Sequence, residues 1–137
     1  MLLVAMVGVV AELLLLEHFE DLWQLIPLIL LVVGLLVVAW HALARSIWSA
    51  RLLRGVMTLS VVSGLLGVFL HYRGNVEFEL EHNPRATGWA LFREAMMGAT
   101  PALAPGVMVQ IGLLGLLYAF LSVKGHPERS EGSTQAE

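Results

Sequence analysis

Four long apolar runs, separated by short polar segments, dominate the hydrophobic pattern of this chain. The runs cover about residues 2–16, 22–44, 52–70 and 103–123. About 20 apolar residues in a helix are enough to cross the hydrocarbon core of a bilayer. The pattern therefore predicts an all-α membrane protein with four transmembrane helices, in a single domain over residues 1–123, followed by a polar flexible tail over residues 124–137.

The ends of the runs carry helix-start signals. Asp21 and Gln24 have the spacing of a capping box, so we expect the second helix to begin near Leu22 and to form an antiparallel hairpin with the first. Thr100 and Pro101 suit the N-cap and first position of the fourth helix. Small residues spaced four apart, which let helix backbones approach closely, are Ser60 and Gly64, Ser63 and Gly67, and Gly115 and Ala119.

The segment over residues 71–100 is the only long connection between the runs. Three apolar residues alternate with three glutamates over residues 76–81, a period of two that predicts a short extended segment. A helix then restarts at Asn83 or at Thr87, with Trp89 and Phe92 on one side. We expect this second element to be a surface helix that lies along the membrane.

Basic residues are distributed unevenly between the two predicted sides of the membrane. Five lie in the segment after the second run and in the tail, namely Arg45, Arg51, Arg54, Lys124 and Arg129, whereas Arg73, Arg85 and Arg93 lie in the long connection. Loops rich in Lys and Arg stay in the cytoplasm. The distribution predicts an integral protein of a bacterial cytoplasmic membrane with both termini inside.

The composition supports a membrane protein and narrows its chemistry. Hydrophobic residues make up 58% of the chain and charged residues only 14%. There are no cysteines, which excludes disulfides, thiolate metal sites and iron–sulfur clusters. The net charge is −3 and there is no basic stripe, so nucleic acid is not an expected partner. The expected partners are the lipid bilayer and other membrane subunits or further copies of the chain.

Histidines and carboxylates gather at the predicted outer end of the bundle. His18 follows the first run and His71 follows the third. Two histidines at matching depth on neighbouring helices can hold haem or another tetrapyrrole. Imidazole and carboxylate together also bind divalent metals. The candidate metal ligands are Glu17, His18, His71, Glu79 and His82. The simpler interpretation is that these polar residues cap helix ends and face water.

Glu12 and Gln110 are the strongly polar side chains predicted to lie within the membrane. A carboxylate inside a span costs about 2.5–3.5 kcal/mol on insertion scales, so Glu12 should be paired. Its expected partners are Gln110, Ser60 or Ser63, either as an interhelical clamp or as part of a proton or cation path.

Three functions are compatible with the sequence. The favoured one is a non-catalytic subunit or self-assembling component of a membrane complex, with Glu77, Glu79 and Glu81 forming an acidic docking strip. The second is a haem-, metal- or pigment-binding anchor that uses His18 and His71. The third is a small proton- or ion-coupled transporter that acts as an oligomer. No motif for nucleotide binding or for nucleophilic catalysis is present, so the chain is not expected to be an enzyme.

Overall fold

The computed structural model describes residues 1–98 and 102–124 of the chain, and these residues form helices and turns without any strand. The helices are α1 (Leu2–Leu15), α2 (Leu22–Ala44), α3 (Ile47–His82), α4 (Gly88–Met96) and α5 (Gly106–Lys124). The predicted all-α class is confirmed. The predicted tail lies outside the described residues, apart from the end of α5.

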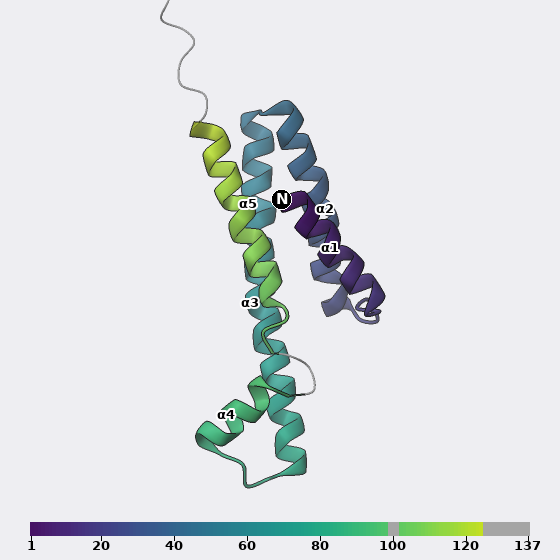
Figure 1. The fold of residues 1–137 in the computed structure, drawn as a ribbon, viewed down its shortest axis with the longest axis vertical. Coiled ribbons are helices and arrows are strands. Elements are labelled where there is room, and N and C mark those ends of the chain that lie inside the picture. The colour runs from purple at the N-terminus through teal and green to yellow at the C-terminus, as the bar shows by residue number, and fades with distance from the viewer. Residues whose placement is uncertain (99–101, 125–137) are drawn as a thin grey trace, which may run out of the picture.

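Helix α3 forms the axis of the molecule (Figure 1). Helices α2 and α5 both run antiparallel to α3 and pack along its first two thirds, and α5 makes the more extensive contact. Helix α1 is shorter, begins at about mid-height of the bundle and descends beside α2. Helix α4 packs against the far end of α3, away from the other helices (Figure 1).

Two helices, α2 and α3, are long and apolar enough to cross a membrane. Only 22% of the most apolar stretch of α2 and 28% of that of α3 are buried within the protein, unlike the core helices of a soluble domain. The apolar parts of α1 and α5 are shorter, at 14 residues for α1 and Gly106–Ser122 for α5.

Local sequence signals explain where the helices begin. The Asp21 side chain accepts a hydrogen bond from the backbone N–H of Gln24 at 2.9 Å, so the predicted start of α2 is confirmed. Only a short turn, Arg45 and Ser46, separates α2 from α3. Arg45 takes a left-handed conformation with φ of 44°, and Ser46 and Ser49 form a reciprocal capping box that starts α3 at Ile47. Thr100 and Pro101 lie outside the described residues, and α5 begins at Gly106.

The predicted extended segment over residues 76–81 is wrong, because α3 continues as a helix through it to His82. Extending an existing helix avoids the cost of nucleation, and Glu and Leu are good helix formers. Arg73 and Glu77 form an ion pair at 2.9 Å with helical i, i+4 spacing. Asn83 caps the helix and Pro84 prevents its continuation. Local helical preference thus outweighs the alternating pattern.

The predicted second helix in this connection is present as α4, which begins after Thr87. Two contacts hold it on α3. The Asn75 side-chain amide donates a hydrogen bond to the carbonyl of Ala95 at 2.8 Å, and the Tyr72 ring lies 5.9 Å from that of Phe92. At about 1.5 Å per residue, the 36 residues of α3 extend about 54 Å. This exceeds the roughly 30 Å hydrocarbon core of a bilayer, so the α4 end of α3 extends beyond the apolar region.

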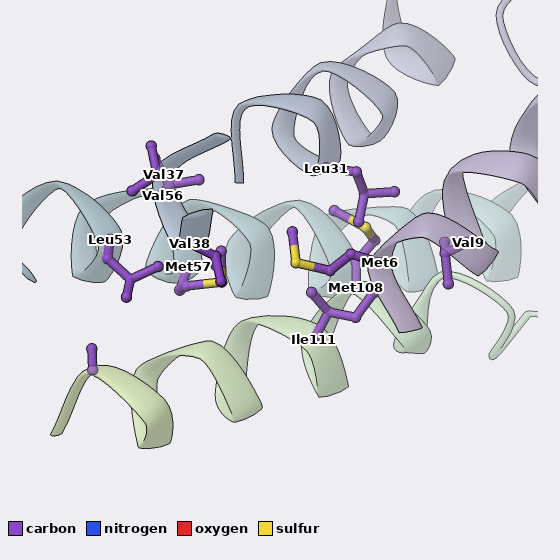
Figure 2. Packing of buried hydrophobic residues seen from close by; sticks show 11 residues of the cluster. Met6, Val9, Leu31, Val37, Val38, Leu53, Val56, Met57, Met108 and Ile111 are labelled. Carbon is purple, nitrogen blue, oxygen red and sulfur yellow. The ribbon is translucent and has the colours of Figure 1, made fainter. Parts of the chain in front are cut away.

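The apolar core lies where α1, α2, α3 and α5 meet. Figure 2 shows Met6, Leu31, Met108 and Ile111 grouped at one level of the bundle, next to Met57. Helices α3 and α5 approach closely because each helix places a glycine against the other helix. A Cβ on Gly64 would lie 2.8 Å from the backbone nitrogen of Val109, and one on Gly112 would lie 2.6 Å from the carbonyl oxygen of Met57. The predicted role of small residues in helix packing is confirmed for Gly64.

Candidate functional site

A cleft of about 660 Å³ opens between the α1–α2 hairpin and the pair formed by α3 and the start of α5. Its walls are largely apolar, with Leu13, Leu16, Ile26, Leu66, Leu70 and Val107 among the lining residues. The cleft has the size and the apolar lining of a site for a small molecule. The polar side chains that line it are Glu12, His18, Asp21, Gln24, Ser63 and His71.

The shape of the cleft follows from two local features. The α1–α2 turn is tight, with Glu17 at a positive φ of 53° and the backbone N–H of His18 bonded to the carbonyl of Leu13. This turn places His18 at the cleft. On the other side, Gly67 lacks a side chain and lets Pro105 lie directly against α3, since a Cβ there would be 2.7 Å from that of Pro105.

His18 and His71 are close to each other in the cleft, as their predicted equal depth requires. Their ring centroids are 6.5 Å apart and the ring planes are inclined by 56°. Nδ1 of His71 is buried and has no hydrogen-bond partner among the described residues. A buried polar atom without a partner is costly.

The larger metal-ligand set is not brought together. Glu79 and His82 lie 8 and 11 residues beyond His71 on the same continuous helix, which places them about 12 and 16 Å farther along its axis. Glu17 is exposed and does not line the cleft. Across residues 1–98 and 102–124, no three His, Cys, Asp or Glu side chains form a group that could hold a metal ion. The reason is the helical continuation of α3, which carries Glu79 and His82 away from His71.

Glu12 lines the cleft from α1 and remains exposed. In the described parts of the chain it forms none of the predicted hydrogen bonds, and the hydroxyl of Ser60 donates instead to the carbonyl of Val56. Ser63 lines the same cleft as Glu12, whereas Gln110 does not. Gln110 is exposed on α5. The two predicted intramembrane polar residues therefore belong to different surfaces.

The charge within the cleft has one sign. Glu12 and Asp21 contribute carboxylates, and no Lys or Arg of the described residues lines the cleft. Asp21 is partly engaged by its capping bond to the Gln24 backbone, whereas Glu12 has no such partner among the described residues. Trp23 adds an aromatic ring to the same lining.

The predicted acidic strip does not form a single row. On a helix, Glu77 and Glu81 share one face, and Glu79 lies about 200° around the axis from Glu77. Glu79 is half-buried, and Glu77 is paired with Arg73. The strip was inferred from an extended conformation, so its continuity is lost with that conformation.

A second polar cluster, at the opposite end of the bundle, was not predicted. His41 is 2% exposed, and its Nδ1 lies 2.9 Å from the hydroxyl of Ser49. Its ring also meets that of Tyr118 edge-on, with centroids 5.7 Å apart. The capping-box spacing of Ser46 and Ser49 was the available sequence signal for this cluster. The cluster ties together the ends of three helices.

The described residues thus form an all-helical bundle with two helices able to span a membrane and with a largely apolar cleft. Comparison of the chain with known protein families, with curated proteins and with solved structures gives no match.

Proposed function

We propose that the protein is a small multi-pass membrane protein that acts as a self-assembling, non-catalytic component of a membrane complex. In this proposal α1 and α5 enter the bilayer together with α2 and α3. Both termini lie on the cytoplasmic side of a bacterial membrane. The three arginines at and just after the α2–α3 turn lie on the same side.

The exposed face of α5 supports self-assembly. Gln110, Leu114, Leu117 and Leu121 are all exposed and follow each other at spacings of four, three and four residues. This is the spacing of a helix–helix seam of the coiled-coil type. The stripe lies opposite the buried face of α5, where Met108, Ile111 and Ala119 pack into the bundle.

The single observation that carries the proposal is the exposure of the Gln110 side chain within the apolar part of the bundle. Val109 packs against Gly64, which is six residues, or about 9 Å, before the end of the apolar stretch of α3 at Leu70. Gln110 therefore lies well inside the apolar part of the bundle. It is exposed and has no hydrogen-bond partner among the described residues. An amide facing lipid would leave its donors and acceptor unsatisfied.

A second copy of the chain is the partner best suited to the hydrogen-bonding groups of this amide. A carboxamide is both donor and acceptor, so two Gln110 side chains at the same level can bond to each other across a two-fold axis. Copies inserted in the same direction bring their α5 helices together in parallel, with the leucines of the stripe in register. Glutamine side chains are known to hold transmembrane helices together in this way.

Cysteine cross-linking in membranes tests the proposal. The chain has no cysteine, so a single introduced thiol reports one position. Leu114→Cys should give a disulfide-linked dimer under mild oxidation. Leu36→Cys, on an equally lipid-facing part of α2 with 68% exposure, is the matched control and should stay monomeric. The proposal fails if both variants cross-link equally or if neither does, and adding Gln110→Leu to Leu114→Cys should remove the dimer.

The pair of histidines favours a second candidate, a haem- or pigment-binding anchor. His18 and His71 are close enough to act together, with ring centroids 6.5 Å apart. The absence of a basic side chain in the cleft weighs against haem, whose propionates would face Glu12 and Asp21. Visible absorption of the protein purified from its own membrane decides this candidate, since a colourless protein excludes it.

A further inference from the structure

The cleft between the α1–α2 hairpin and α3 combines apolar walls with acidic side chains. We propose that it binds a lipophilic organic cation, with Glu12 as the counter-charge. The inference concerns a surface other than the α5 stripe, so it does not depend on self-assembly.

The apolar walls of the cleft set the first requirement on a ligand. Side chains from α1, α2, α3 and the start of α5 surround a volume of about 660 Å³, and most of them are aliphatic. An apolar ligand body can pack in van der Waals contact with these aliphatic walls. A small hydrated ion gains nothing from such walls, and three ligand groups for a metal ion do not come together in residues 1–98 or 102–124.

The charges in the cleft set the second requirement. Glu12 and Asp21 are both acidic, and none of the Lys and Arg residues within 1–98 and 102–124 lines the cleft. A ligand with a phosphate or carboxylate group would face two like charges without any compensating Lys or Arg. A cation would pair with Glu12, the carboxylate that has no hydrogen-bond partner among the described residues. Trp23 lines the same cleft and offers an aromatic face to a cation.

The histidines strengthen this preference for an amine or ammonium ligand with hydrogen-bonding groups. His18 and His71 both line the cleft, with their ring centroids 6.5 Å apart. In its neutral form an imidazole can accept a hydrogen bond from a protonated amine. The cleft therefore offers a carboxylate, an aromatic ring and two imidazoles to a positive group, and aliphatic walls to the rest of the molecule.

Tetraphenylphosphonium is a suitable probe, because tetraphenylborate has the same shape and the opposite charge. Binding of each ion to the purified full chain in a non-ionic detergent is measured by equilibrium dialysis. We expect saturable binding of tetraphenylphosphonium at one ion per chain, with no saturable binding of tetraphenylborate. Glu12→Gln should weaken the binding about tenfold or more, the typical loss when a charged partner is removed.

Glu81→Gln is the matched control, because Glu81 is an exposed carboxylate near the far end of α3 and outside the cleft. It should bind tetraphenylphosphonium as the unaltered chain does. Asp21→Asn provides a second test, since asparagine also caps helices and keeps the start of α2 intact. It should weaken binding by a smaller factor than Glu12→Gln.

Two results would overturn the proposal. One is equal affinity of Glu12→Gln and the unaltered chain for tetraphenylphosphonium, in samples with the same helical content and elution volume. The other is saturable binding of tetraphenylborate as tight as that of the cation. Gln110→Leu should retain the binding site, so a failure of self-assembly and a failure of the cleft are told apart.

Discussion

At the scale of single residues, glycines decide how closely α3 and α5 pack. Gly64 and Gly55 lie on the same helix, but only Gly64 faces α5. A Cβ on Gly64 would lie 2.7 Å from a methyl of Val109 and 2.8 Å from its backbone nitrogen, whereas a Cβ on Gly55 would meet nothing within 4 Å. Since the backbone of α5 cannot yield as a flexible side chain does, the two positions should respond oppositely to the same substitution.

We predict that Gly64→Ala lowers the free energy of unfolding by about 1–3 kcal/mol, the usual cost of overpacking. Gly55→Ala should be neutral or stabilising by up to about 1 kcal/mol, because alanine is the better helix former. Unfolding of the purified protein in detergent, followed by far-ultraviolet circular dichroism, measures both. Equal losses for the two variants would contradict the packing described for the seam.

Individual residues also show what sequence alone can reveal. The cap at Asp21 was predictable because its partner Gln24 is three residues away. The similar depth of His18 and His71 was predicted from their positions just after apolar runs, whereas the 6.5 Å between their rings comes from the packing of the helices. The contact of His41 with Ser49 and Tyr118 was not, since it depends on where three separate helices end in space.

At the scale of elements, the continuation of α3 is the main departure from expectation. Alternating glutamates and apolar residues suggested an extended segment. They follow the first part of α3 directly, and the helix continues through them and ends at His82, just before Asn83 and Pro84. The period-two pattern reports a local preference, and the preceding helix outweighs it. The acidic strip was derived from that segment and loses its continuity, and the helix carries Glu79 and His82 away from His71.

Single cysteines at Phe78 and Glu79 distinguish the two conformations. In the helix, Phe78 is 47% exposed and Glu79 is half-buried. We therefore predict that Phe78→Cys reacts faster than Glu79→Cys with a membrane-impermeant maleimide. An extended segment with an apolar inner face would give the reverse order. Glu81→Cys, exposed in either case, serves as the reference for full reactivity.

At the scale of the whole molecule, two surfaces differ in chemical character. The cleft on one side is apolar with acidic groups, whereas the α5 stripe is apolar with one neutral amide. The number of apolar runs was apparent from the sequence, and α2 and α3 are confirmed as long enough to span a membrane. The cleft was not apparent, because it arises from the outward inclination of the α1–α2 hairpin (Figure 1), which no local pattern encodes.

We propose above that the protein assembles with itself inside a membrane through Gln110. The most direct measurement is the mass of the particle in lipid nanodiscs, by native mass spectrometry, for the unaltered chain and for Gln110→Leu and Gln110→Asn. We predict a dimer for the unaltered chain, a monomer for Gln110→Leu and a retained dimer for Gln110→Asn, whose amide is shorter but still self-complementary. A monomeric unaltered chain, or a dimer that persists in Gln110→Leu, would contradict the account.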